Sequence, residues 1–164
     1  MAAVFRGKDF VEMNASHPMT GYVHTMYALH AMAGLMGVTS GATVIGAFVF
    51  GLPSILAVIM NYARRDAVSG SWLDSHFEWQ RRTFWSALII GLLIFGGAFV
   101  LMLFGFVSLA STPLTGGAGA LGAGAAFGGA VVGLYLSAFV AGVWILYRVV
   151  RGWLALRDRR PMYA

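Results

Sequence analysis

The sequence predicts an all-α integral membrane protein with four transmembrane helices and one cytoplasmic amphipathic helix. Of its 164 residues, 59% are apolar and only 10% are charged, whereas a soluble domain usually has about 25% charged residues. The eleven Lys and Arg residues stand in groups separated by long uncharged apolar stretches. Four spans with both termini and the central loop in the cytoplasm place every positive charge inside. Three spans would leave Arg6 and Lys8 on the outer face.

The chain is predicted to form one membrane domain with two short cytoplasmic ends. Residues 1–20 form the N-terminal segment, residues 21–156 the membrane domain and residues 157–164 the tail. Residues 1–20 have no apolar core before a small-residue cleavage site, so no cleaved signal peptide is expected. The chain has no cysteine, which excludes disulfides and thiolate metal sites. The net charge is +5. Its basic residues flank apolar segments, which favours anionic lipid headgroups over nucleic acid as partners.

The four spans are expected at residues 22–38, 42–63, 84–107 and 127–149. The first is near the lower length limit for crossing the hydrocarbon. A competing interpretation makes one helix of residues 22–50 and breaks it at Gly51–Pro53, which leaves a return segment of only about eleven residues, too short to cross. Residues 111–126, with Pro113 and a run of Gly and Ala, predict an outer loop or a frayed extension of the fourth helix.

Residues 71–83 predict a helix that lies in the cytoplasmic interface and runs into the third span. Ser71 followed by Asp74 is typical of a helix start, and Glu78 and Arg82 are spaced for an ion pair. Anchoring at the headgroups is the simplest interpretation, and a docking surface or a gate is the alternative. Catalysis by His76 with Glu78 is not expected, since residues two apart on a helix do not face each other. The residues predicted to contact lipid or a partner are Trp72, His76, Trp79, Arg81, Arg82, Trp85, Arg148, Arg151 and Trp153.

His30 is the candidate for intramembrane chemistry, because an ionisable group inside a span suggests function. It could relay protons, ligate a pigment or haem iron, or form a hydrogen bond to a neighbouring helix. Bis-histidine haem ligation needs a second histidine on a facing span, and the second, third and fourth predicted spans contain none. The hydrogen-bonded interpretation is therefore favoured, with no catalytic residue, metal ligand set or cofactor expected.

Small residues recur at four-residue spacing in the fourth span, which lets helices approach closely. These residues pack the bundle itself or contact another protein. The predicted packing set is Gly124, Gly128, Gly129, Gly133, Ser137 and Gly142.

Two parts of the chain carry a family resemblance. The central part comprises Asn61–Asp66 and Gly70–Trp85, and the C-terminal part comprises Val143–Leu156 and Arg160–Met162. Both resemble a bacterial family of small inner-membrane proteins without an assigned function, which is related to the membrane subunit of the chloroplast inner-envelope protein-import translocon. The resemblance covers roughly residues 24–162 and implies a four-helix membrane bundle. This chain departs from the family pattern in a longer first hairpin and an enlarged Gly/Ala loop at 111–126.

These observations predict a non-enzymatic protein of the bacterial inner membrane, with both termini cytoplasmic. The leading hypothesis is an accessory or scaffold subunit that packs against a larger respiratory, photosynthetic or translocation complex. An oligomeric channel or translocon-like component is the first alternative. A cofactor or pigment binder that uses His30 is the second.

Overall fold

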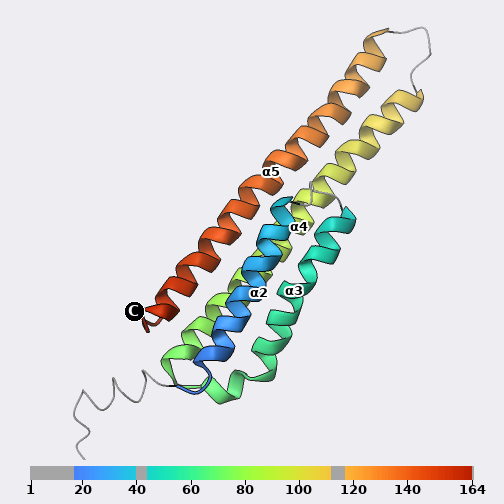
Figure 1. The fold of residues 1–164 in the computed structure, drawn as a ribbon. Helices are drawn as coiled ribbons and strands as arrows, with labels where there is room; N and C mark the ends of the chain where they lie inside the picture. Colours follow the sequence, from blue (N-terminus) through green and yellow to red (C-terminus); the bar gives the residue numbers. More distant parts are fainter. Residues whose placement is uncertain (1–16, 40–43, 112–116, 164) are drawn as a thin grey trace, which may run out of the picture.

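The computed structural model describes residues 17–39, 44–111 and 117–163, and its regular structure is entirely helical. Helix α2 (Thr20–Thr39) and helix α3 (Val44–Ala63) form a first hairpin. A short 3₁₀ helix, η1 (Arg65–Val68), leads into α4 (Trp72–Ser111), and α5 (Gly117–Arg157) returns along α4. The all-α prediction is correct for these ranges (Figure 1). The predicted N-terminal segment lies outside the described residues up to residue 16.

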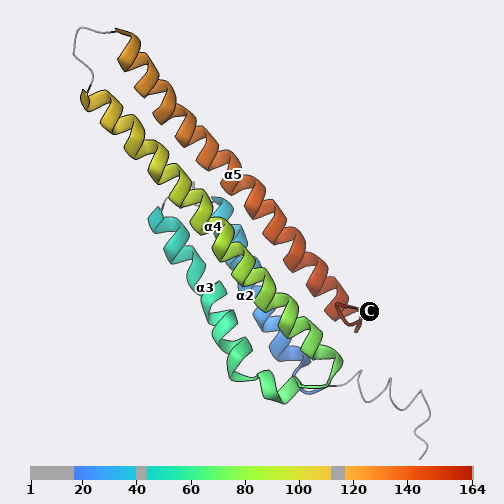
Figure 2. The same ribbon diagram turned by 180° about the vertical axis from the view of Figure 1, so that it is seen from behind.

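The two hairpins differ in length, and this difference sets the architecture. Helices α4 and α5, of 40 and 41 residues, extend about 60 Å at 1.5 Å per residue. Helices α2 and α3, of 20 residues each, extend about 30 Å. The short hairpin packs beside the end where α4 begins and α5 ends, so the far end of α4 and α5 projects alone (Figures 1 and 2). The largest interface is between α4 and α5, and α2 contacts both α3 and α5.

The prediction of four transmembrane helices is wrong. Along the described residues, two helical stretches are long and apolar enough to cross a membrane, Trp72–Ser111 and Leu121–Arg157. Polar side chains such as His24, Thr25 and His30 interrupt α2, and the described apolar part of α3 is only the short stretch Gly51–Ala63. The competing interpretation of one helix over residues 22–50 depends on residues 40–43, which lie outside the described residues between α2 and α3.

The helix predicted at residues 71–83 runs into the following apolar helix as predicted, but its apolar face is buried in the bundle and not at a membrane interface. Residues 72–83 are the first turns of α4 and continue without a break into the apolar part of that helix. Their apolar face, with Leu73, Phe77 and Trp79, is buried against the rest of the bundle. The helix starts immediately after Ser71 as predicted, but the Ser71 hydroxyl donates backwards to the Val68 carbonyl at 2.7 Å. The ion pair between Glu78 and Arg82 is confirmed.

The Gly/Ala segment is mostly helix. The structure extends α4 to Ser111 and begins α5 at Gly117, so the alternative of a helical extension is correct for residues 117–126. Residues 112–116 of the predicted loop lie outside the described residues. The small residues that pack between α4 and α5 are Ala98, Gly105, Ala123 and Ala130.

The hydrophobic core lies entirely at the end that contains all four helices. Tyr27 and Val23 of α2 pack there against Phe77 of α4 and Val149 of α5. At the projecting end, large apolar side chains are exposed on both helices; Leu93, Phe104, Leu121 and Val132 are all at least 65% exposed. The core therefore fixes one end of the molecule and leaves the other as a bare two-helix hairpin.

Gly152 is required where α5 crosses α2. A Cβ at this position would lie 2.5 Å from the Tyr27 hydroxyl oxygen and under 3 Å from its ring. Tyr27 has little room to retreat because it is only 1% exposed. The absence of a side chain at Gly152 is thus what lets the two helices approach.

We expect Gly152→Ala to lower the free energy of unfolding by about 1–3 kcal/mol, because overpacking displaces a rigid side chain. Gly21→Ala is the matched control: nothing lies within 4 Å of a Cβ there, and Ala has the higher helix propensity. Thermal unfolding of the full chain in one detergent measures both. Equal melting temperatures for the two variants would contradict the contact.

Candidate functional site

A cluster of five polar side chains is buried at the four-helix end. We call it the polar cluster: Tyr27 from α2, Asn61 from α3, and His76, Gln80 and Thr83 from α4, each no more than 4% exposed. Burying polar groups is costly unless they are hydrogen-bonded. Their partners therefore show what the cluster does.

His76 joins α2, α4 and the C-terminal tail. Its Nε2 lies 2.9 Å from the Arg160 carbonyl oxygen, which can only accept, so Nε2 carries the proton. Its Nδ1 is then the acceptor for the Tyr27 hydroxyl at 3.1 Å. The tail is held a second time by the Met162 amide, which donates to the Ser75 hydroxyl at 3.0 Å. These bonds fix residues 158–163 against the start of α4.

Asn61 and Gln80 complete the cluster in different ways. The Asn61 side-chain amide donates to the Phe77 carbonyl of α4 at 2.9 Å. The Gln80 amide lies near the Tyr27 phenol but makes no well-formed hydrogen bond with a described residue. Burial raises the pKa of the Tyr27 phenol above its usual value, and the neighbouring Gln80 partly offsets that effect.

A basic, aromatic pocket of about 450 Å³ opens beside the polar cluster, between α4 and α5. Arg148 lies under it, with its guanidinium carbon 3.9 Å from the centre of the Trp79 ring. The Arg148 Nε donates to the Thr83 hydroxyl at 3.0 Å, and the Trp79 indole donates to the Arg148 carbonyl at 3.1 Å. We call this the arginine pocket; its lining is Trp79, Arg81, Arg82, Trp85, Ser86, Ile89, Arg148 and Tyr163.

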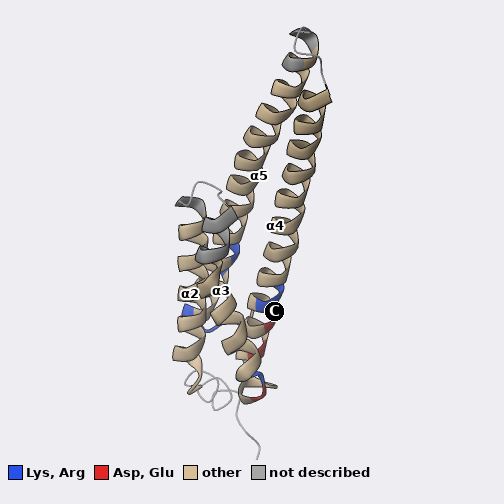
Figure 3. Ribbon diagram, turned by 90° about the vertical axis from the view of Figure 1, so that its right-hand side faces the viewer, with Lys and Arg blue, Asp and Glu red and all other residues tan. Residues whose placement is uncertain are grey.

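The arginine pocket has an excess of positive charge. Arg82 forms an ion pair with Glu78 and also lies over the Tyr163 ring. Among the described residues, no carboxylate forms an ion pair with Arg81, Arg148 or Arg151. The described arginine positions, blue on the ribbon of Figure 3, lie towards this end of the molecule. A larger hollow of about 890 Å³ on α5 has a mostly apolar lining, and its Arg160 is paired with Asp158.

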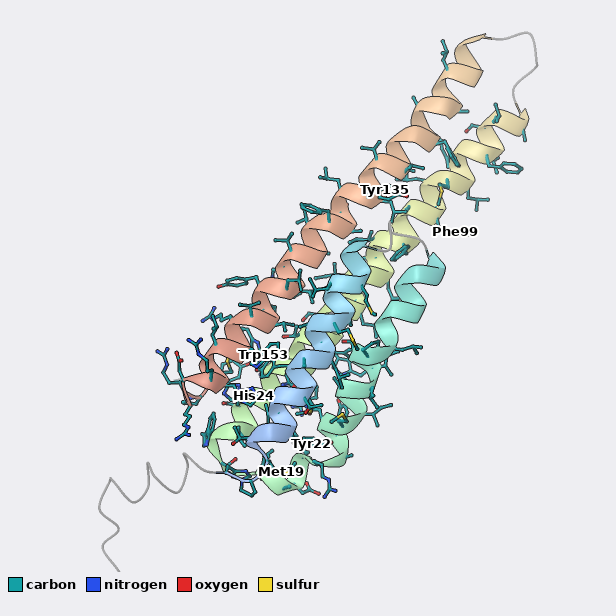
Figure 4. All side chains as sticks on the ribbon, viewed as in Figure 1. Met19, Tyr22, His24, Phe99, Tyr135 and Trp153 are labelled. Atoms are coloured by element: carbon teal, nitrogen blue, oxygen red, sulfur yellow. The ribbon has the colours of Figure 1, made fainter. Side chains whose placement is uncertain are left out.

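The structure separates the predicted lipid or partner residues into groups. Trp79, Arg81, Arg82, Trp85 and Arg148 meet in the arginine pocket, and Arg151 lies 5.6 Å from the Trp79 ring centre. Trp72 instead packs edge-on against the buried His76. Trp153 donates to His24 at 2.8 Å across the α2–α5 interface, where Figure 4 shows both side chains.

His30 joins α2 to α3. Its Nδ1 lies 2.6 Å from the Ser54 hydroxyl, and the side chain is 4% exposed. This is the helix-to-helix hydrogen bond that the sequence favoured. Burial lowers the pKa of His30 from its usual 6.5 to about 4.

Four of the predicted packing residues have open space where a side chain would lie. No described neighbour lies within 4 Å of a Cβ built at Gly124, Gly128, Gly129 or Gly133. Ser137 is exposed and Gly142 is half-buried. On α4, Gly105 does approach α5, because its Cβ would lie 3.5 Å from the Phe127 amide nitrogen.

Sequence reasoning missed Tyr27, Asn61, Gln80 and Tyr163. Gln80 carried a usable signal, because it stands four residues after His76 and so shares its helix face. Tyr163 had none, since its contact with Trp79 depends on the tail folding back.

We expect Tyr27→Phe to destabilise the protein by about 1–3 kcal/mol, because it leaves the buried His76 Nδ1 without its donor. Tyr135→Phe is the matched control, since Tyr135 is 51% exposed. Thermal unfolding in detergent compares the two. A destabilisation by Tyr27→Phe no larger than that by Tyr135→Phe would argue against the bond.

We expect stability to fall as the pH is lowered from about 6.5 to about 4. Because burial depresses the pKa of His30 to about 4, the unfolded chain binds the proton first in this window. The loss reaches roughly 3 kcal/mol at its acid end. His30→Asn keeps a polar side chain but does not titrate, so its unfolding free energy should be flatter across the window. Parallel pH profiles for the two proteins would refute this assignment.

Comparisons with family models, with curated proteins and with solved structures found no match to this chain. The resemblance to the inner-membrane family therefore stays a prediction.

Proposed function

We propose that this chain is a non-enzymatic accessory subunit of the bacterial inner membrane. In this proposal the α4–α5 hairpin crosses the bilayer, and the α2–α3 hairpin lies on the cytoplasmic side with both termini. The uncharged part of α4 extends from Thr83 to Ser111, about 43 Å at 1.5 Å per residue. That exceeds the hydrocarbon thickness of about 30 Å.

The distribution of charge supports this orientation. The described Arg residues precede the uncharged part of α4 or follow that of α5, so one crossing and return leaves them all on one side. An excess of Lys and Arg marks the cytoplasmic face. The short hairpin starts and ends on that same side, which is why it does not disturb the arrangement.

The observation that carries the accessory role is the exposed glycine pair Gly129 and Gly133 on α5. Four-residue spacing puts them on one helix face, and a side chain at either would meet nothing within 4 Å. Glycine is a poor helix former, so these positions cost stability without improving the packing of this bundle. In membranes, such pairs let another helix approach closely.

The chemistry of this face supports an apolar occupant. Val132, Leu136 and Val140, which neighbour the glycine pair, are each at least 60% exposed, and α5 has no charged residue before Arg148. The fitting partner is an apolar transmembrane helix of another protein. Its backbone would lie against Gly129 and Gly133.

We expect the double variant Gly129→Leu/Gly133→Leu to lose its partner without losing its own fold. Tagged full-length chain is purified from native membranes in mild detergent, and complexes are resolved on native gels and identified by mass spectrometry. The wild type should run with a stoichiometric partner, and the double variant should run alone with a melting temperature no lower than that of the wild type.

Two glycine variants serve as controls. Gly97→Leu on α4, which is also open, should keep the partner, whereas Gly105→Leu should unfold the α4–α5 contact. A complex that survives in the double variant would contradict the proposed face. A complex containing only copies of this chain would replace the accessory role with an oligomer.

A further inference from the structure

We propose that the arginine pocket binds the phosphate of one anionic phospholipid, with the acyl chains lying along α4. The inference rests on the proposed insertion of the α4–α5 hairpin, since only then does the pocket meet lipid. It assigns one specific phosphate site to residues that the sequence predicts only collectively as lipid or partner contacts.

The pocket brings three guanidinium groups to one opening. Arg81, Arg82 and Arg148 line it, and Glu78 is the only carboxylate that forms an ion pair with any of them among the described residues. Guanidinium groups bind phosphate oxygens through paired, charge-assisted hydrogen bonds. The surplus of positive charge therefore favours a phosphate group without a neighbouring cation.

Arg148 is held in position before any ligand arrives. Its guanidinium stacks on the Trp79 ring, and its Nε donates a hydrogen bond to the Thr83 hydroxyl. Its two terminal nitrogens form no hydrogen bond to a described residue, so they are available to a phosphate. Restricting a side chain in this way reduces the entropy lost on binding.

The other wall of the pocket distinguishes a lipid from a free anion. Ile89 and Trp85 line it and are 56% and 46% exposed. Beyond them α4 continues with the exposed Leu92 and Leu93. A phosphate near the arginines would therefore have its acyl chains against an apolar helix surface, where burial of each CH₂ group is favourable. Inorganic phosphate would use only the basic half of the pocket.

The C-terminal tail completes the site. Tyr163 lines the pocket and packs edge-on against Trp79. The Arg82 guanidinium lies over the Tyr163 ring. The tail is positioned by Ser75 and His76, as described above. Tyr163→Ala therefore alters the pocket without replacing any arginine or any helical residue.

Native mass spectrometry of the full-length chain in detergent tests the site. The probes are phosphatidylglycerol and phosphatidylcholine with identical acyl chains, each titrated separately. The wild type should retain one phosphatidylglycerol in preference to phosphatidylcholine. Arg148→Gln and Arg81→Gln should each weaken that retention about fivefold, given roughly 1 kcal/mol per basic residue. Tyr163→Ala should also weaken it.

Arg65→Gln is the matched control, because it removes one exposed positive charge from the same end without lining the pocket. If Arg65→Gln weakens phosphatidylglycerol retention as much as Arg81→Gln does, the lipid binds a diffuse basic surface. That outcome would overturn the proposed site. Competition by millimolar inorganic phosphate would assign the pocket to a free anion instead. Arg81→Gln and Tyr163→Ala leave the Arg148–Thr83 bond intact, so misfolding of Arg148→Gln would not block the test.

The two proposals fail in different ways. Partner loss is measured on complexes from native membranes, whereas lipid retention is measured on the purified chain. Flotation of the chain with phosphatidylcholine vesicles reports insertion alone. If the chain floats with the vesicles but retains no phosphatidylglycerol, the proposed lipid site is refuted and the proposed accessory role is unaffected.

Discussion

The separation of charge from apolar length along α4 and α5 is the constraint on which the rest of the structure depends. Each helix is about twice as long as a hydrocarbon layer requires, and the charged residues are confined to the part of each helix beside α2 and α3. A helix satisfies its own backbone hydrogen bonds, so the uncharged part needs no polar partner. The charged part of each helix does need polar partners. The hydrophobic core and the polar cluster form at that end.

At that end, polar contacts fix how the helices fit together. Apolar packing alone tolerates small shifts of one helix along another, whereas a buried hydrogen bond has one acceptable geometry. Tyr27 with His76, Asn61 with Phe77, and Trp79 with Arg148 each join two different helices. Arg148 over Trp79 adds a cation–π contact of about 0.5–1 kcal/mol, since Arg148 is only partly buried. The same contacts that align α4 with α5 therefore also shape the arginine pocket.

The sequence was a good guide to helices and a poor guide to their roles. Hydropathy located all four, and Ser71 marked the start of α4 correctly. Counting apolar runs overestimated the number of crossings, because α2 is interrupted by polar side chains and the described apolar part of α3 is only the short stretch Gly51–Ala63. Sequence reasoning also misread residues 71–83, whose aromatic face is buried by α2, α3 and the tail rather than by headgroups. Contacts such as that of Tyr27 with Gly152 join residues far apart in the chain, and no local sequence pattern predicts them.

The charge pattern explains why the predicted number of spans was wrong. It also explains why the proposed orientation, with the basic residues in the cytoplasm, does not depend on that number. Basic residues on one side show only that the chain crosses an even number of times between them. Two spans and four spans satisfy that condition equally well, because a helical hairpin that does not cross returns to the side on which it began. The α2–α3 hairpin is such an addition: it changes the count by two and leaves every charge where it was. Helix length and hydropathy separate the helices instead: among the described residues, Trp72–Ser111 of α4 and Leu121–Arg157 of α5 are long and apolar enough to cross a membrane.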